Sequence, residues 1–337
     1  MGQSCISFSS KKTLPPNGGV FKTQDKGVTW AQKTALLSSG AAVNFSSVSS
    51  INGFYFDPSD HSAIYALTPG NGLLYSYSGG EGWSQPSQMA TGPINSIAID
   101  PKDKCTIYLG VQNKIAKSID CNRSYDRIYQ DTRGDSVITN VVVDFYNPTI
   151  VYAGNSYGDF LKSTDSGMNW KVVYRFGNKI TKMVMDNNDS RIFYAAVDGL
   201  GMQKTTNAGE EWIDLSDALK DFPNARTFRD MVMDPTQKNT LFYANRYGLL
   251  KTTDGGTTWT DIPLLTPPSS TDIKSLVINP KNSLEIYYIT ATTFYSSNDG
   301  GATWQTQKLP TAFEANVLGI DPEAPENIFL GVKALAN

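Results

Sequence analysis

Short apolar alternations recur along the whole chain and predict β-strands almost throughout. The segments SIAIDPKDKCTIYLG (96–110), DMVMDPTQKNTLFYAN (230–245) and SLVINPKNSLEIYYIT (275–290) each contain an alternating strand, a polar turn with Asp-Pro or a variant, and a second strand rich in Ile, Tyr and Ala. Period-two alternation bounded by turn residues is typical of half-buried strands. The hydrophobic pattern therefore predicts an all-β protein built from hairpins.

A second pattern, Ser/Thr-x-Asp-x-Gly-x-x-Trp, follows these hairpins and predicts a turn between two further strands. Full copies are TQDKGVTW (23–30), STDSGMNW (163–170), TTDGGTTW (252–259) and SNDGGATW (297–304), and weaker copies are SYSGGEGW (76–83), SIDCNRSY (118–125) and TTNAGEEW (205–212). The third positions are 25, 78, 120, 165, 207, 254 and 299, so the gaps are 42 to 53 residues. Seven units of about 45 residues, each with four short antiparallel strands, are typical of propeller blades.

The two ends of the chain complete each other. Residues 316–337 contain the first two strands of a unit, and residues 17–30 contain the last two. We therefore predict a flexible leader over residues 1–16 and one domain over residues 17–337. That domain is a seven-bladed propeller whose last blade is closed by strands from both termini, which hides sheet edges that an open array leaves unpaired. Six closed blades with one irregular element are the alternative.

The repeated carboxylate has a structural explanation. A short carboxylate in a turn accepts hydrogen bonds from backbone N–H groups, a glycine supplies positive φ, and a tryptophan packs between neighbouring strands. One catalytic site does not need seven copies, and the sequence has no 12-residue calcium loop of alternating oxygen ligands. We therefore predict structural roles for Asp25, Trp30, Trp83, Asp120, Asp165, Trp170, Asn207, Trp212, Asp254, Trp259, Asp299 and Trp304.

The repeated motif resembles the Asp-box, or BNR, repeat. This repeat is found in sialidases, xyloglucanase-type glycoside hydrolases, sortilin-type receptors and Ycf48-like photosystem II assembly factors. The resemblance extends from about residue 17 to residue 337 and is specific for fold rather than function, because the motif is scaffold. Length and blade count are most similar to the single-propeller Ycf48-like group, whereas xyloglucanase-type enzymes generally use two propellers facing a cleft.

We expect function at one face of the propeller. If the strands of a blade are called A to D in chain order, the B–C and D–A loops share this ligand face. Six of the eight arginines fall in or beside these loops, and arginine favours planar carboxylate or phosphate partners. Whether they recognise an anion or a partner protein, or only occupy exposed loops, stays open. The candidate ligand-face residues are Arg127, Arg133, Tyr157, Asp159, Arg175, Asp198, Arg226, Arg229, Asn245, Arg246 and Tyr247.

A glycoside hydrolase is the alternative function. It would need two carboxylates about 5–10 Å apart. A sialidase is disfavoured because only Glu314 among seven glutamates falls on the expected face and no arginine-Ile-Pro signature is present. The sequence instead favours a non-catalytic binding or assembly module, acting on a protein partner, a polysaccharide or an anionic ligand. The loop aspartates that keep the hydrolase open are Asp131, Asp135, Asp159, Asp198, Asp221 and Asp230.

Charge and composition narrow the function classes further. The net charge is −3 and no run of five like charges occurs, which disfavours nucleic-acid and membrane-surface binding. One histidine and three cysteines cannot form a His- or Cys-rich metal site, and a Ser-His-Asp triad would require His61, which sits in a polar turn. We expect no cofactor, no metal and a monomer.

The cysteines predict the compartment. Cys105 and Cys121 are equidistant from Asn113, the expected centre of a hairpin, so they should face each other at a separation that a disulfide accepts. A disulfide implies an oxidising, extracytoplasmic location, and two free thiols are the alternative. Cys5 precedes a Ser-rich segment, and this start resembles that of a mature bacterial lipoprotein. Membrane contact is then expected only through a lipid on Cys5; a stray cysteine in the leader is the other reading.

Overall fold

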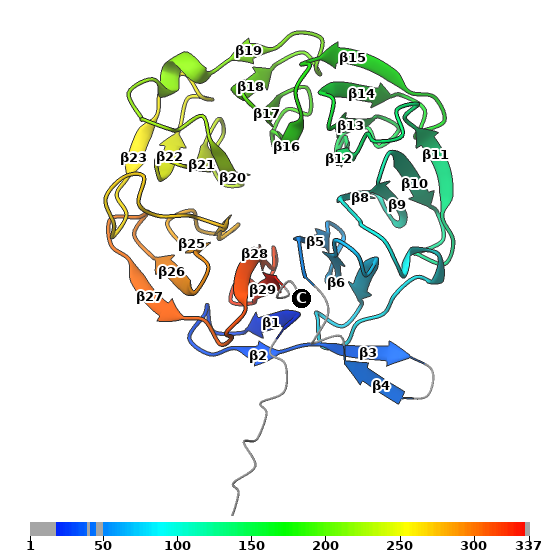
Figure 1. Ribbon diagram of the computed structural model, residues 1–337, viewed down its shortest axis with the longest axis horizontal. Coiled ribbons are helices and arrows are strands. Elements are labelled where there is room, and N and C mark those ends of the chain that lie inside the picture. Colours follow the sequence, from blue (N-terminus) through cyan, green and yellow to red (C-terminus); the bar gives the residue numbers. More distant parts are fainter. Residues whose placement is uncertain (1–17, 39–40, 45–49, 334–337) are drawn as a thin grey trace, which may run out of the picture.

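The chain folds into a ring of seven β-sheets around a central axis (Figure 1). The computed structural model describes residues 18–38, 41–44 and 50–333. The seven-bladed propeller predicted from the repeats is therefore confirmed, and the six-bladed alternative is wrong. The expected leader over 1–16, with Cys5, lies outside the described residues. Among the described residues the only helices are two short 3-10 turns, η1 (Ser87–Met89) and η2 (Ser216–Leu219).

Each blade is an antiparallel meander whose first strand lies nearest the axis (Figure 1). Blade 1 contains β5 (Gly53–Asp57), β6 (Asp60–Leu67) and β7 (Leu73–Ser76). Blades 2 and 3 contain β8 (Ser96–Asp100), β9 (Asp103–Val111), β10 (Lys114–Ser118), β11 (Asp126–Gln130), β12 (Ile138–Val143), β13 (Val151–Asn155), β14 (Asp159–Ser163) and β15 (Lys171–Arg175). Blades 4 to 6 contain β16 (Ile180–Met185), β17 (Phe193–Val197), β18 (Gly201–Thr205), β19 (Ile213–Asp214), β20 (Phe228–Met233), β21 (Leu241–Asn245), β22 (Leu249–Thr252), β23 (Thr260–Ile262), β24 (Ser275–Ile278), β25 (Ile286–Ile289), β26 (Thr293–Ser297) and β27 (Gln305–Lys308).

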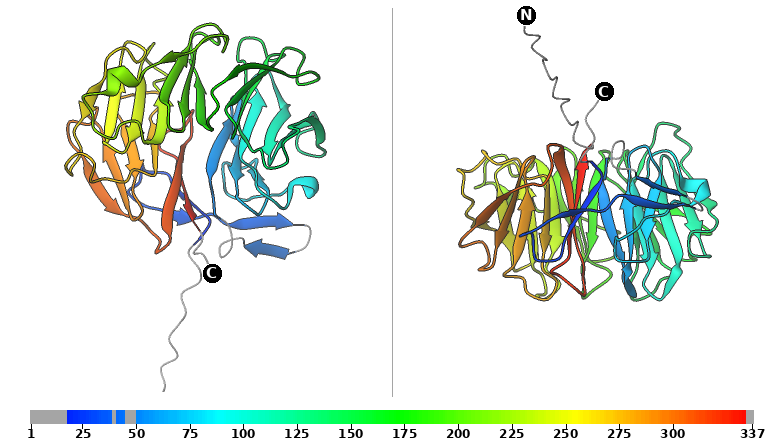
Figure 2. Two further views of the ribbon diagram at one scale, coloured as in Figure 1. Left: turned by 45° about the horizontal axis from the view of Figure 1, so that its top comes forward. Right: turned by 90° about the horizontal axis from the view of Figure 1, so that it is seen from below.

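Blade 7 joins the two ends of the chain. Its order is β28 (Glu314–Ile320), β29 (Ile328–Lys333), β1 (Val20–Thr23) and β2 (Ala31–Gln32). The antiparallel register between β1 and β29 pairs Val20 with Gly331 and Thr23 with Ile328. Figure 2 shows the blue β1 beside the red β29. The predicted closure by both termini is confirmed.

Blade 1 departs from the regular pattern at its outer edge. Its fourth position is a short segment in which Ser84 pairs with Tyr75. The hairpin of β3 (Ala35–Ser38) and β4 (Ala41–Asn44) lies outside this segment (Figure 1). Trp83 forms two backbone hydrogen bonds with one edge of β3, on either side of Leu36. Its N–H donates to the Ala35 carbonyl at 2.9 Å, and its carbonyl accepts from the Leu37 N–H at 2.7 Å. The sequence pattern did not predict this added hairpin.

The seven repeated turns share one hydrogen-bond plan, and the turn of blade 6 illustrates it. The Ser297 hydroxyl donates to Asp299 at 2.7 Å and accepts the Gly301 N–H at 2.8 Å. Asp299 also accepts the Thr303 N–H at 2.9 Å and the Thr303 hydroxyl at 2.5 Å. The Thr303 and Ser297 hydrogen bonds lower the pKa of Asp299 to about 2. All of these hydrogen bonds join residues of the same turn.

The glycine of this turn has a steric reason. Gly301 has φ +92°, and a Cβ at this position would collide with the side chain of Ile262 in blade 5. Equivalent glycines in other blades likewise approach a side chain of the preceding blade, as Gly209 approaches Phe160. The turn therefore fixes the spacing between neighbouring blades.

A further backbone bond ties each repeated turn to a residue at the beginning of the second strand of its own blade, either two residues before that strand or at its third residue. The Ser166 N–H donates to the Thr149 carbonyl at 2.8 Å, and the Gly300 N–H donates to the Leu284 carbonyl at 2.9 Å. In blade 2 the same pair of positions is Cys121 and Cys105, whose backbone bond is 3.2 Å.

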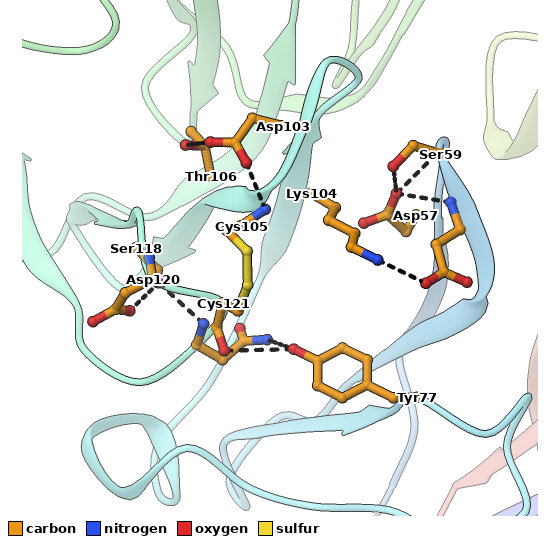
Figure 3. Close-up of a disulfide and its surroundings, with 12 residues drawn as sticks. Asp57, Ser59, Tyr77, Asp103, Lys104, Cys105, Thr106, Ser118, Asp120 and Cys121 are labelled. Atoms are coloured by element: carbon orange, nitrogen blue, oxygen red, sulfur yellow. Dashed lines mark hydrogen bonds and ion pairs between the residues drawn. A yellow bond between two sulfur atoms is a disulfide. The ribbon is translucent and has the colours of Figure 1, made fainter.

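The predicted disulfide between Cys105 and Cys121 is present (Figure 3). The reasoning that predicted it was slightly wrong, because β9 and β10 pair Val111 with Lys114. The hairpin centre is thus between residues 112 and 113 rather than at Asn113. Cys121 lies beyond β10, and the shared backbone bond of the repeated turn brings it to Cys105.

Candidate functional site

Two parts of the molecule bring polar side chains from different blades together on the ligand face defined by the B–C and D–A loops. The first is the mouth of a central channel of about 1020 Å³, which is lined by the innermost strand of every blade. The second is a set of loops on blades 2 to 5. Both arise because the innermost strand starts, and the second strand ends, at this face.

Ion pairs occupy the channel mouth. Lys182 on β16 pairs with Asp230 on β20. Arg229 donates to Asp272 at 2.8 Å, and Lys274 bridges Asp272 at 3.0 Å and Glu314 at 2.8 Å. Each cation at the mouth that comes from these strands therefore has a carboxylate partner.

Asp230 also holds neighbouring blades together. Its second oxygen accepts the Leu276 N–H at 2.9 Å and the Ser275 hydroxyl at 3.1 Å, both from blade 6. With Lys182 on blade 4, this carboxylate links three blades. Its hydrogen-bonding capacity is thus used within the scaffold, which makes it a poor general acid or base.

A second cluster lies at the boundary of blades 2 and 3. Arg133 donates to Asp131 through Nε at 2.9 Å and through Nη2 at 2.7 Å, and Nη2 also pairs with Asp159. Arg175 contacts the other Asp159 oxygen at 3.4 Å. The amide of Asn155 donates to both carboxylates, at 3.0 Å and 3.2 Å. The structure thus brings two of the loop aspartates together.

The charge state of Asp131 is set by its partners. Burial alone would raise the pKa of Asp131, but hydrogen bonds from Arg133 and the Ser136 hydroxyl outweigh it and lower the pKa to about 2. A glycosidase requires one carboxylic acid whose pKa is raised, so that it can protonate the leaving group. The shift at Asp131 is in the opposite direction.

The rim of this cluster is aromatic and partly exposed. The Arg133 guanidinium lies over the Tyr157 ring, 4.4 Å from its centroid. The Tyr157 hydroxyl donates to Asp135 at 2.6 Å, and this bond raises the pKa of Tyr157. Three carboxylates and two arginines therefore meet here, so the cluster carries no excess of positive charge.

Blade 5 carries exposed positive charge on the ligand face. Arg226 and Arg246 are exposed, and neither forms an ion pair with any residue that the structure describes. The Tyr247 ring packs on Phe222 at 5.2 Å between centroids. Asn245 is fully buried and accepts the Tyr247 N–H at 2.9 Å, so it shapes the B–C loop from below.

Two expected members of the ligand face are set apart from these groups. Asp198 accepts the Thr181 hydroxyl at 2.9 Å, beside the channel mouth. Arg127 lies near the start of β11, where the strand leaves its repeated turn, and it bonds to Gln130 at 2.7 Å. The structure does not bring Arg127 to the other arginines.

Lysines were missed by the sequence reasoning. Lys182 and Lys274 lie at the channel mouth, whereas the candidate cations predicted from the sequence were all arginines. Their position, directly after a D–A loop and at the start of an innermost strand, is a signal that the sequence does contain. Lys182 pairs with Asp230 of blade 5 and Lys274 pairs with Glu314 of blade 7, and spacing along the chain does not reveal such pairs. The second partner of Lys274, Asp272, lies two residues earlier in the same loop.

Other site classes find no support in the described part of the chain. Over residues 18–38, 41–44 and 50–333, no group of three His, Cys, Asp or Glu side chains is placed to hold a metal ion. Within the same residues, no helix has the length and apolar character needed to cross a membrane.

Comparisons with known proteins show the fold. No protein-family model matches the chain, and no curated protein matches it. The GH74 xyloglucanase from Xanthomonas campestris is similar in structure, with a TM-score of 0.67 and 16% identity over 84% of this chain and 51% of that chain. This chain thus spans about half the length of that enzyme.

Other similar structures are matched over nearly the whole length of their own chains. YCF48 bound to D1 peptide has a TM-score of 0.66 and 14% identity, over 89% of this chain and 99% of that chain. YCF48 from Cyanidioschyzon merolae has a TM-score of 0.60 and 14% identity, over 86% of this chain and 97% of that chain. At these identities, the likeness establishes a propeller shared by hydrolases and by YCF48.

Proposed function

We propose that this protein is a non-catalytic, extracytoplasmic binding or assembly module that binds a protein partner or an anionic ligand through its ligand face. The observation that carries the proposal is the exposed pair Arg226 and Arg246, which lacks ion-pair partners among the described residues. Two exposed guanidinium groups without carboxylate partners among the described residues offer charge and planar hydrogen bonding to a ligand.

The comparison with YCF48 supports a role in protein binding. That protein is similar to this chain over nearly its whole length, and one of its structures contains a D1 peptide. We propose that the repeated turns are Asp-boxes and that the chain is a bacterial, monomeric propeller of the Ycf48-like type. Nothing in this proposal requires the same peptide, because the loops determine what is bound.

A glycoside hydrolase remains the second candidate, on one observation. Asp131 and Asp159 share the Arg133 and Asn155 donors, so their carboxylates are close together on the ligand face. The low pKa of Asp131 speaks against acid catalysis at this pair. Measuring sugar release from β-glucans, xyloglucan and sialosides tests this candidate directly.

The location proposed here rests on the disulfide. The bond between Cys105 and Cys121 persists in oxidising compartments, which supports export. A lipid anchor on Cys5 remains a proposal from the sequence, since that residue lies outside the described residues.

Charge reversal tests the binding proposal. The double variant Arg226→Glu/Arg246→Glu is compared with Arg123→Glu, an exposed arginine in a repeated turn on the opposite face. Binding to an array of acidic and neutral peptides of equal length is measured at low and physiological salt. We expect the wild type and Arg123→Glu to prefer acidic peptides, and the double variant to lose about tenfold or more in affinity. Equal binding by all three proteins would reject this face.

A further inference from the structure

The face opposite the ligand face carries a pocket of about 790 Å³ between blades 3 and 4. Its walls come from the A–B turns of both blades and from the repeated turn of blade 4. This volume falls in the usual range of about 300–1000 Å³ for small-ligand sites. The pocket shares no residue with the central channel or with the ligand-face loops. A function of this pocket is therefore independent of the proposed function.

A lysine recurs at one position of the repeated unit, and its contacts at this pocket differ from those in three other blades. In five blades a lysine directly precedes the Ser or Thr of the repeated turn and lies over an aromatic ring of its own blade. Three of these lysines also donate to the carbonyl at the fourth position of the next blade's turn. These bonds are Lys22 to Gly79 at 2.8 Å, Lys117 to Ser166 at 3.0 Å and Lys204 to Gly255 at 2.8 Å.

At the pocket this bond is not made. Lys162 lies over the Tyr152 ring, 5.5 Å from its centroid, but it has no hydrogen-bond or ion-pair partner among the described residues. The equivalent fourth position in the next turn is Ala208, and both Lys162 and Ala208 line the pocket. A donor and an acceptor that are joined at three other seams are therefore not bonded to each other here, and both residues line the pocket.

The other charged residues that line the pocket are Arg191 and the three carboxylates Asp144, Asp189 and Glu210. Arg191 forms a two-pronged pair with Asp189, at 2.9 Å and 2.7 Å. Asp144 accepts the N–H groups of Tyr146 and Asn147 at 2.8 Å and 3.0 Å. Lys162 faces an environment without excess positive charge, so a neutral acceptor suits it better than a free anion does.

An aromatic rim completes the site. Tyr146 is 79% exposed and Phe145 is 38% exposed, and both line the pocket. Exposed aromatic side chains beside buried polar groups are typical of anchor positions in protein interfaces. The amides of Asn147 and Asn188, also in the lining, add donors and acceptors that match a peptide backbone.

We propose that this pocket binds an extended peptide segment of another protein. One peptide group of the segment donates its N–H to the Ala208 carbonyl, and a carbonyl of the segment accepts from the Lys162 ammonium. An apolar side chain of the segment packs on Tyr146 and Phe145. The ligand thereby replaces the direct bond between lysine and turn carbonyl that closes three other seams.

The test uses capped tripeptides, acetylated and amidated, with a central Gly, Leu, Phe or Tyr. Their affinity for the full chain is measured by NMR titration. We expect saturable binding that is strongest for Phe or Tyr, and Lys162→Met to weaken it about tenfold or more. Lys251→Met is the matched control, because Lys251 lies over Phe242 in the same way but does not line this pocket.

Further variants separate the pocket from general damage to the fold. Lys162→Arg keeps the donor and should retain most of the affinity, and Tyr146→Ala should weaken the aromatic peptides more than the Gly peptide. Absence of saturable binding up to about 10 mM peptide would overturn the proposal. So would equal losses in Lys162→Met and Lys251→Met, or tighter binding of acetate or of glucose oligomers than of any capped peptide.

Discussion

The disulfide of blade 2 allows a stability effect to be worked out from the structure. In the other blades, the equivalent positions are joined by a backbone hydrogen bond alone, as Ser166 is joined to Thr149 at 2.8 Å. The double variant Cys105→Ser/Cys121→Ser should therefore keep the native turn and lose only the covalent link. The cysteines are separated by 16 residues. Opening a loop of this length costs about 3 kcal/mol of unfolding free energy, because the unfolded chain gains entropy.

This free energy converts into a modest shift in melting temperature. A chain of 337 residues has an unfolding entropy of roughly 0.7 kcal/mol/K, so the double variant should melt about 4 °C lower. Scanning calorimetry measures the shift, and hydrogen exchange should show faster opening of residues 103–125. Intact mass before and after reduction establishes that the wild type gains two hydrogens from this pair. An unchanged melting temperature with a proven disulfide would refute the entropic reasoning.

The same contact offers a second check in another blade. Thr149→Cys with Ser166→Cys places two cysteines at the positions that correspond to Cys105 and Cys121. We expect oxidation of this variant to form a new disulfide and to raise the unfolding free energy by up to about 3 kcal/mol. Cysteines that stay reduced under air oxidation would show that the equivalence between blades does not extend to side-chain direction.

Two further perturbations test the scaffold. Gly301→Ala should lower the unfolding free energy by about 1–3 kcal/mol, measured by urea denaturation, because φ is positive and Cβ would collide with Ile262 of the preceding blade. Gly134→Ala, where a Cβ meets open space, should change little. The pKa of Asp131 is depressed to about 2, so its stabilisation of roughly 2 kcal/mol is present above about pH 4 and is lost as pH falls toward 2. Arg133→Met should lower the free energy of unfolding at neutral pH. Between pH 5 and pH 3, the variant should lose about half or less of the unfolding free energy that the wild type loses. An equally steep loss in the variant would contradict the assignment.

The fold could be predicted from the sequence because every repeated unit contains the same kind of turn. Each turn uses a hydroxyl, then a carboxylate, an amide or a second hydroxyl, and a residue with positive φ, and these requirements are visible in eight consecutive residues. Even the exceptional turn follows them, since Asn122 takes the glycine position at φ 70°. The closure of blade 7 was equally readable from incomplete units at the two ends.

The site was less predictable because its contacts join blades. Arg133 and Asp159 are 26 residues apart, and Lys182 and Asp230 are 48 apart, with a whole strand or blade between them. Composition indicated arginines in the loops, but not which of them would be neutralised by carboxylates. Only the folded structure shows that Arg133 and Arg229 have carboxylate partners. It also shows that Arg226 and Arg246 have no such partner among the described residues.

Closure by β1 and β29 has a consequence for biosynthesis. Val20 and Gly331 become neighbours in one sheet, so nearly the entire chain must be available before the ring can close. During synthesis, β1 waits as an unpaired edge while six blades form behind it, and unpaired edges are prone to wrong pairing. A nascent chain of this design therefore benefits from a chaperone or a translocation channel that keeps its first strand apart until its last strand arrives.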